Sequence, residues 1–203
     1  MQNIRAKLFL LVIPALILIS FSAKYIYAQA APLDISATTV LFEFNPKPDA
    51  EIKDTIRIRN NSSSQNNLKV GIKKLEQGDT GQPILNDLAK NDLFKEQITF
   101  EKERFTLSAN GTAEIPFTIK IPTSAAFGYY YAITVTQDET AKDGTVKFVG
   151  EMAIPLIINV QKPGAKIEAG IESFKTKKNI NEYLPVEFET KIKNLGNVST
   201  KVR

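Results

Sequence analysis

From residue 31 onward, the chain consists of short segments in which apolar and polar residues alternate, with turn-forming residues between them. In residues 51–60, EIKDTIRIRN, the isoleucines fall at even positions and charged residues occupy most of the others. Alternation with a period of two places one side of a strand on a core and the other in solvent. Segments of this kind at regular spacing are typical of an all-β sandwich.

Residues 31–161 hold about seven or eight such segments, which fits one antiparallel sandwich of the immunoglobulin-like class. The predicted strands are Ile35–Phe44, Glu51–Asn60, Leu68–Leu75, residues 98–100, Arg104–Leu107, Thr112–Pro122, a strand containing Tyr129–Val135, and Thr145–Val160. The last of these contains Gly150 and Pro155, and we expect it to bend at one of them.

Three adjacent tyrosines follow Gly128 in the segment PTSAAFGYYYAITVTQ. If all three were exposed, they would form an aromatic surface suited to stacking on sugars. In a strand, however, Tyr129 and Tyr131 share the continuous apolar face, and Tyr130 points the other way. Core packing is the favoured interpretation, and each buried phenol then needs a hydrogen-bond partner. Tyr130 remains as the one candidate binding residue.

The alternation lapses in residues 76–96, EQGDTGQPILNDLAKNDLFKE. Here the pattern indicates a long connection that contains one short helix, capped by Asp79 or Thr80, with Leu85, Leu88 and Ala89 on its apolar side. Long connections in sandwiches often carry specificity. The other interpretation is an insertion that only closes one end of the core.

The chain contains neither cysteine nor histidine. Without disulfides, each domain depends on a sufficiently large apolar core. Without histidine or cysteine, the serine–histidine and cysteine–histidine nucleophile pairs and the common zinc sites are excluded. Carboxylate or serine–lysine catalysis is compatible with the composition but has no visible motif. The sequence therefore predicts a protein that is not an enzyme and has no cofactor or metal.

The N-terminus, residues 1–30, reads as a secretory signal peptide. Arg5 and Lys7 precede the apolar run Leu8–Ala23, and Ala28-Gln29-Ala30 presents small residues for cleavage. The run is short against the roughly 20 residues of a membrane span, although an uncleaved anchor is the alternative. The chain has 26 basic and 22 acidic residues, and three of the basic ones lie in this segment. The remaining charge is nearly balanced, so nothing indicates nucleic-acid binding.

The segment QKPGAK, residues 161–166, has the composition of a linker, and residues 162–203 are expected to hold this linker and the first strands of a second sandwich domain. Strands are expected near Ala165–Phe174 and at Leu184–Lys193, where Val186, Phe188 and Ile192 share a face. The segment TKIKNLGN repeats the pattern of IRIRNNSS in the first domain. About 40 residues cannot bury a sandwich core, so the second domain is expected to be incomplete. A genuine two-stranded end is the alternative.

Two further patterns have simple structural explanations. Asp138, Glu139 and Asp143 offer oxygen ligands for calcium, but their spacing fits no known loop, which favours a solvated hairpin tip. Asparagine sequons begin at residues 60, 61, 110 and 197. They would accept glycans in a eukaryotic secretory pathway, whereas in a bacterium they are turn residues.

The order FTLSANGTAEIPFTIKIPTSAAFGYYYAITV, together with NPKPDAEIKDTIRIRNNSS, resembles bacterial envelope sandwich domains. It is similar to the N-terminal, peptidoglycan-binding domain of the WxL-interacting cell-surface proteins, over residues 33–160 and faintly beyond. In that family a signal precedes this domain, a second sandwich and a C-terminal membrane anchor. Residues 1–203 contain no such C-terminal anchor, which agrees with the expectation that the sequence is a fragment. The shared patterns also occur in other sandwiches, including pilus chaperones, and no ligand residue carries over.

These observations favour a non-enzymatic protein that is exported to the cell envelope or cell surface and binds cell-wall glycan or an envelope protein. The alternative is a periplasmic chaperone-like module that binds client strands by edge addition. A glycan-acting enzyme would need two carboxylates at a fixed separation, for which the sequence offers no motif. Membrane anchoring through an uncleaved N-terminus or a missing C-terminal segment is compatible with either reading.

Overall fold

A computed structural model describes residues 33–78, 81–138, 150–176 and 186–200. The predicted signal peptide and most of the hairpin at residues 137–144 lie outside these ranges. Among the described residues, no helix has the length and apolar character needed to cross a membrane.

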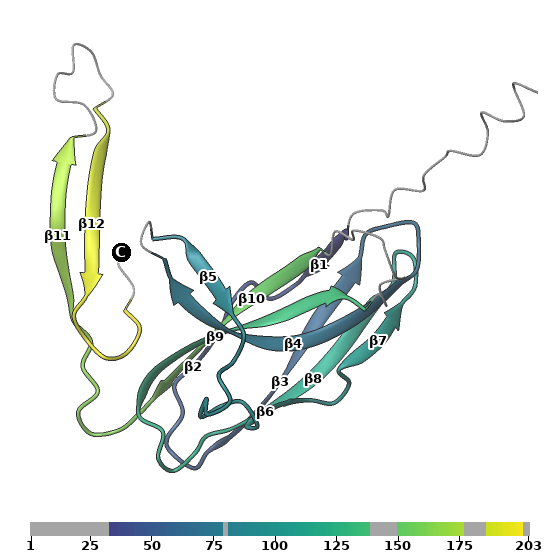
Figure 1. Cartoon of the computed structure of the whole chain (residues 1–203), viewed down its shortest axis with the longest axis horizontal. Helices are drawn as coiled ribbons and strands as arrows, with labels where there is room; N and C mark the ends of the chain where they lie inside the picture. Colours follow the sequence, from purple (N-terminus) through teal and green to yellow (C-terminus); the bar gives the residue numbers. More distant parts are fainter. Residues whose placement is uncertain (1–32, 79–80, 139–149, 177–185, 201–203) are drawn as a thin grey trace, which may run out of the picture. The chain divides into compact units, whose positions relative to one another are not determined.

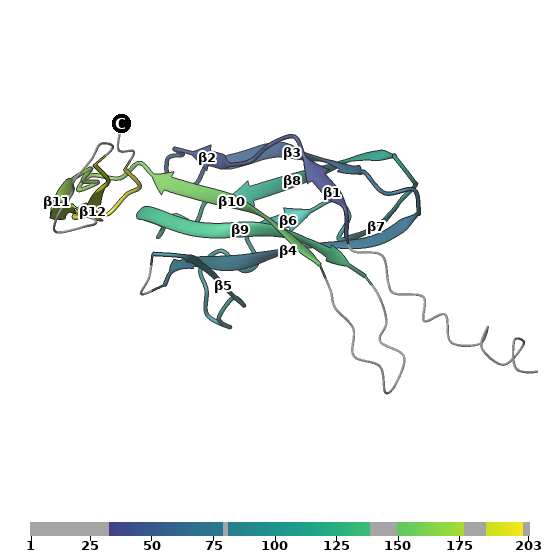
Figure 2. The ribbon, with the colours of Figure 1, turned by 90° about the horizontal axis from the view of Figure 1, so that it is seen from above.

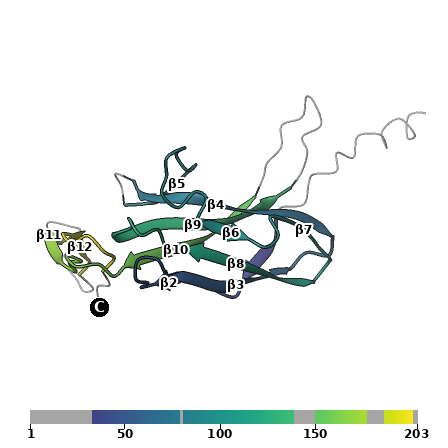
Figure 3. The same cartoon turned by 90° about the horizontal axis from the view of Figure 1, so that it is seen from below.

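Two facing sheets form the body of the protein (Figures 1, 2 and 3). The first sheet has the order β1 (Ile35–Ala37), β3 (Glu51–Asn60), β8 (Thr112–Lys120) and β6 (Ile98–Phe100). The second has the order β2 (Phe42–Phe44), β10 (Glu151–Val160), β9 (Phe127–Gln137), β4 (Asn66–Gln77) and β5 (Pro83–Asn86), and β7 (Arg104–Leu107) also pairs with β4. All pairings are antiparallel except that of β2 with β10. The predicted all-β, immunoglobulin-like sandwich is confirmed.

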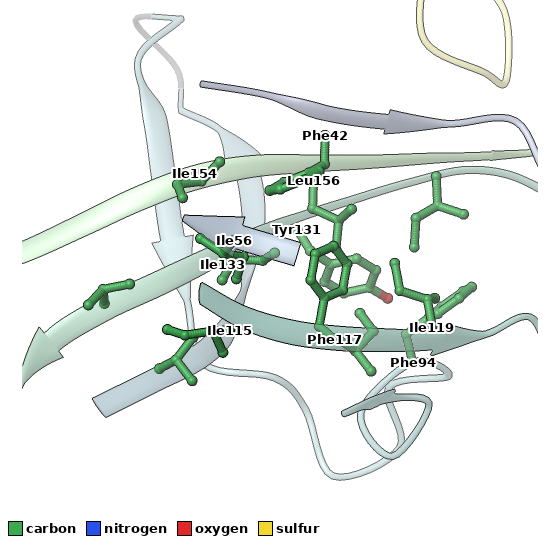
Figure 4. Packing of buried hydrophobic residues seen from close by; sticks show 14 of the residues in the cluster. Phe42, Ile56, Phe94, Ile115, Phe117, Ile119, Tyr131, Ile133, Ile154 and Leu156 are labelled. Carbon is green, nitrogen blue, oxygen red and sulfur yellow. The ribbon is translucent and has the colours of Figure 1, made fainter. Parts of the chain in front are cut away.

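The core lies between the sheets, where the alternating apolar residues meet. Figure 4 shows Ile56, Ile115, Phe117 and Ile119 facing Tyr131, Ile133, Ile154 and Leu156 across the interior. Phe42 from β2 packs edge-on against Phe117, with ring centroids 5.1 Å apart. Burying one such side chain contributes about 1.5–3 kcal/mol, so a chain without disulfides holds its sheets together through this layer.

The first predicted strand, Ile35–Phe44, is wrong as a single element. It is divided into β1, which pairs with β3 in the first sheet, and β2, which runs parallel to β10 in the second. Residues 38–41 carry the chain from one sheet to the other. The division lets one short segment cover part of the edge of both sheets and places Phe42 in the core.

The helix predicted in residues 76–96 is also wrong. Residues 83–86 form β5, which pairs with the end of β4 after a turn in which the Gly78 N–H donates to the Gln82 carbonyl at 2.8 Å. The outer edge of β4 offers unpaired backbone groups there, and pairing satisfies them. Phe94 is fully buried in the core. The connection therefore contributes a buried residue to the core.

After the linker, β11 (Ala169–Thr176) and β12 (Phe188–Asn194) form a separate two-stranded sheet. One face carries apolar side chains that are largely exposed: Ile171 at 70%, Phe174 at 65% and Phe188 at 59%. The other face carries ion pairs such as Lys191–Glu172, with 3.0 Å between Nζ and Oε2. Both strands were predicted: β11 begins four residues later than predicted, and β12 begins at Phe188, while the predicted start at residues 184–185 lies outside the described ranges. A complete second sandwich stays a prediction.

The turn between β3 and β4 depends on Asn60, which is fully buried. Its Nδ2 donates to the carbonyls of Ser64 at 2.7 Å and Ser108 at 3.0 Å, while its Oδ1 accepts from the Ser62 N–H and from Asn66 Nδ2. The side chain thereby joins the β3–β4 turn to the β7–β8 turn. Buried polar groups of this kind are costly to leave unpaired.

We expect Asn60→Ala to lower the free energy of unfolding by about 2–3 kcal/mol, because several buried backbone groups lose their partner. The matched control is Asn61→Ala at the adjacent, exposed asparagine, which should change stability by about 0.5 kcal/mol or less. Urea unfolding followed by circular dichroism measures both. Equal effects of the two substitutions would contradict the role assigned to Asn60.

Candidate functional site

The tyrosines of β9 divide as the alternation predicted. Tyr131 is fully buried and Tyr129 is half-buried, and the ring of Phe94 lies 4.7 Å from Tyr129 and 5.7 Å from Tyr131, centroid to centroid. The Tyr131 hydroxyl donates to Asp92 Oδ1 at 2.8 Å, and the Tyr129 hydroxyl accepts from the Ala126 N–H at 3.1 Å. Both phenols therefore have the predicted partners, and these two tyrosines are structural.

Asp92 joins the core tyrosines to the long connection. Burial by itself would raise the pKa of Asp92, but hydrogen bonds from the Phe94 N–H and the Tyr131 hydroxyl, with the nearby Lys74 ammonium, hold it below its ordinary value. Lys74 Nζ lies 3.5 Å from Asp92 Oδ2 and 4.3 Å from the centroid of the Tyr131 ring. Burial, followed by the hydrogen bond to Asp92, raises the pKa of Tyr131.

Tyr130 lies on the outer face of the second sheet and lines a cavity of about 670 Å³. The other lining residues come from the β4–β5 hairpin, from β10 and from the segment after β12: Lys74, Leu75, Glu76, Gln77, Gly81, Pro83, Ile157, Asn194, Ser199 and Thr200. Burial raises the pKa of the Tyr130 phenol above its ordinary value. The sequence indicated Tyr130 but not the cavity, since one wall comes from residues about 65 positions further along the chain.

The charged groups of this cavity are already engaged. Lys74 is paired with Asp92, and Glu76 Oε2 accepts a hydrogen bond from Asn86 Nδ2 at 2.7 Å. Among the described residues, no hydrogen bond joins the Tyr130 hydroxyl to another group. The cavity thus combines apolar walls with an aromatic ring and uncharged hydrogen-bonding groups. Such a lining suits an uncharged ligand with both apolar and polar groups.

A second candidate site is a stretch of sheet edge on β10. Its partner β2 covers only Leu156–Ile158, so Glu151–Pro155 pairs with β9 alone among the described residues. Pro155 has no N–H to donate to β9, although it lies inside the continuous β9–β10 ladder. The backbone groups of this residue are therefore the ones that point away from β9. The Gln161 N–H, six residues on, donates to the Pro46 carbonyl on that same outer side, at 2.7 Å.

Because N–H groups two residues apart point the same way along a strand, those of Glu151 and Ala153 face the open edge. The carbonyls of these two residues and of Pro155 face it too. Leu33 lies directly beside Gly150 and therefore bounds this stretch of edge at one end. The approach is so close that a Cβ added to Gly150 would lie 2.6 Å from the Leu33 Cβ. We call Glu151–Pro155 the open edge. A proline within an otherwise continuous strand was its only sequence signal.

The first sheet has a corresponding uncovered stretch, at Glu51–Ile56 of β3, because β1 pairs only with Ile58–Asn60. Exposed charges protect it, including the Lys53–Glu51 ion pair at 2.8 Å. Charged side chains on an edge oppose pairing with another chain. The open edge on β10 carries one exposed charge, Glu151, and it is paired with Lys73.

The remaining candidates from the sequence have structural roles where the structure describes them. Asn60 is buried, Asn61 Nδ2 donates to Asp34 Oδ1, and Asn197 Nδ2 donates to the Gly164 carbonyl. Asp138 pairs with Arg104 at 3.3 Å, while the other proposed calcium ligands, residues 139 and 143, lie outside the described ranges. Within those ranges, no group of three or more acidic side chains is placed to hold a metal.

No protein-family model and no curated protein matches the chain. Among solved structures, this chain is similar to the class 5 fimbriae chaperone CfaA, with 12% sequence identity and a TM-score of 0.48. The match covers 81% of this chain and 68% of the chaperone. The CsuC–CsuE chaperone–tip adhesion subunit complex of Acinetobacter baumannii matches with 12% identity, coverages of 81% and 73%, and a TM-score of 0.48. A PapD-like domain of human CEP192 matches with 8% identity, coverages of 68% and 92%, and a TM-score of 0.44.

We expect the Asp92 cluster to make stability depend on acid pH. The pKa of Asp92 in the folded state lies below the value of about 3.9 for an unfolded chain. The charged carboxylate therefore stabilises the fold above about pH 3.9, and this stabilisation is lost as the pH falls through the folded-state pKa. Asp92→Asn should cost about 1–2 kcal/mol at pH 7, because an amide attracts Lys74 less strongly. Its stability should fall less between pH 5 and about pH 2. Urea midpoints across this range test both statements, and parallel curves for the two proteins would contradict them.

Proposed function

We propose that this chain is a non-enzymatic binding protein of the cell envelope that takes up an extended segment of a partner protein as an added strand on β10. The observation that carries the proposal is the open edge, Glu151–Pro155, which lies in an otherwise well-paired sheet. Strand addition uses main-chain hydrogen bonds for affinity and alternate side-chain contacts for specificity. Export follows from the predicted signal peptide and is part of the proposal.

The open edge offers an incoming strand two N–H donors and three carbonyl acceptors. Beside it, residues 38–41 carry the exposed apolar side chains of Val40, at 81%, and Leu41, at 39%. Leu41 immediately precedes the Phe42–Leu156 pairing, so it borders the place where β2 leaves β10. An added strand would satisfy the backbone groups of the edge and cover apolar surface there. A partner segment with small or apolar side chains on one side fits these contacts.

The edge carries this proposal, because the described lining of the cavity around Tyr130 offers no unpaired basic group for a partner's terminal carboxylate. Among the described residues that line this cavity, the one cation is Lys74, which is paired with Asp92. We therefore propose that the partner contributes an internal strand rather than a chain end. The resemblance to the WxL-interacting proteins stays a prediction from the sequence.

A second candidate function, binding of cell-wall glycan, is favoured by the cavity around Tyr130. An aromatic ring with a hydroxyl that has no described protein partner, next to uncharged amide and hydroxyl groups, suits a sugar that presents an apolar face and hydroxyls. The two functions use different surfaces, so separate substitutions distinguish them.

For strand addition, Ala153→Pro should abolish partner binding, since it removes one of the two N–H donors of the open edge. Ala153→Val retains the donor and is the control. A photo-cross-linking residue at Glu151 in the envelope-exported chain should give adducts that persist in the Ala153→Val variant and disappear in the Ala153→Pro variant. Hydrogen exchange of the complex should show protection of the Ala153 amide. Adducts and affinity that are equal in the two variants would refute edge addition.

For glycan binding, Tyr130→Ala should reduce retention on purified cell wall at least tenfold, which corresponds to about 1.4 kcal/mol. Tyr130→Phe separates the ring from the hydroxyl. If the ring stacks on a sugar, Tyr130→Phe should retain most of the binding. Equal retention of the wild type and Tyr130→Ala, measured by co-sedimentation, would remove this second function without affecting the first.

A further inference from the structure

The segment Asn194–Ser199 begins at the last residue of β12 and lies against the sandwich. We call it the latch segment. The Gly128 N–H donates to the Asn197 carbonyl at 2.8 Å. Asn159 Nδ2 donates to Ser199 Oγ at 2.7 Å, and the Ser199 N–H donates to Asn159 Oδ1 at 3.0 Å. Gly128 and Asn159 are direct partners in the β9–β10 ladder, so these bonds meet at one position of the sheet.

The latch segment is itself held in a defined conformation. Asn197 Oδ1 accepts from the Lys166 N–H at 2.7 Å, and its Nδ2 donates to the Gly164 carbonyl at 3.0 Å, so one side chain binds the linker twice. Asn194 Nδ2 donates to the Val198 carbonyl at 2.8 Å, and the Val198 side chain is buried. Satisfied amides and a buried apolar anchor indicate a built contact rather than a chance approach.

The close approach of the latch segment to β9 favours glycine at position 128. A Cβ on Gly128 would lie 3.2 Å from the Asn197 carbonyl oxygen and 2.9 Å from the Tyr130 hydroxyl. Glycine in the interior of a strand weakens it and often marks the close approach of another backbone. Here that backbone is the latch segment. Gly196 within the latch segment is more tightly constrained, since a Cβ there would overlap the Lys166 carbonyl oxygen.

We propose that the latch segment fixes the β11–β12 sheet to the sandwich and forms a closing wall of the cavity that contains Tyr130. Asn194 and Ser199 both line that cavity. The two-stranded sheet buries little of its own apolar surface, and two strands alone are marginally stable. Docking through the latch segment therefore supplies order that the sheet cannot generate by itself. This inference does not depend on strand addition at β10.

The absence of cysteine makes a clean test possible. Spin labels on Lys120→Cys in β8 and Lys193→Cys in β12, in the full chain, report the distance between the two parts by pulsed electron resonance. We expect one narrow distance distribution in the wild-type background. Gly128→Ala and, independently, Asn159→Leu should broaden it at least twofold. Gly71→Ala is the matched control, because its Cβ would only touch Thr134 Oγ1 at an ordinary 3.6 Å.

The cavity wall has its own measurement. A thiol at Leu75→Cys, inside the cavity, should react with an uncharged maleimide several-fold faster in the Asn159→Leu background than in the wild-type background. Circular dichroism confirms that each variant retains its sheets, and Asn159→Leu decides the question if Gly128→Ala does not fold. A broad distribution in the wild type, or an unchanged narrow one in Asn159→Leu, would overturn the latch. An unchanged thiol reaction rate would overturn the closing wall.

Discussion

The register between β9 and β10 is the constraint on which the rest of the structure depends. Ten consecutive pairs, from Phe127–Val160 to Thr136–Glu151, fix which side chains of both strands face the core. The same register puts Pro155 opposite Ala132, with its missing N–H on the outer side, and Gly128 opposite Asn159, where the latch segment binds. A slip of one residue would reverse every face. Core, open edge and latch are therefore consequences of one ladder.

The division of the first strand explains why only parts of the sheet edges are open. β1 covers the end of β3 in one sheet, and β2 covers the end of β10 in the other. The uncovered stretches that this division leaves on β3 and β10 differ in chemistry. The stretch on β3 carries exposed charges that oppose pairing, whereas the stretch on β10 adjoins exposed apolar residues at the crossing. This difference is the physical basis for choosing β10 as the binding edge.

Sequence reasoning was accurate where local alternation decides the outcome. It identified the faces of β3 and β9, including an inward Tyr131 and an outward Tyr130. It failed in residues 76–96, where spaced leucines suggested a helix. There the free edge of β4 favoured a hairpin, and Phe94 was taken into the core. Local propensity is a weak preference that tertiary contacts override.

The sequence by itself determined an all-β chain with inward and outward faces, because alternation is a property of neighbouring residues. It also excluded disulfides and histidine chemistry, because composition alone decides both. Only the tertiary structure decided where the first strand divides, which edge of β10 stays open, and that Asn197 and Ser199 meet Gly128 and Asn159. These contacts join residues far apart in the chain. Their geometry depends on register and sheet packing, which no local pattern encodes.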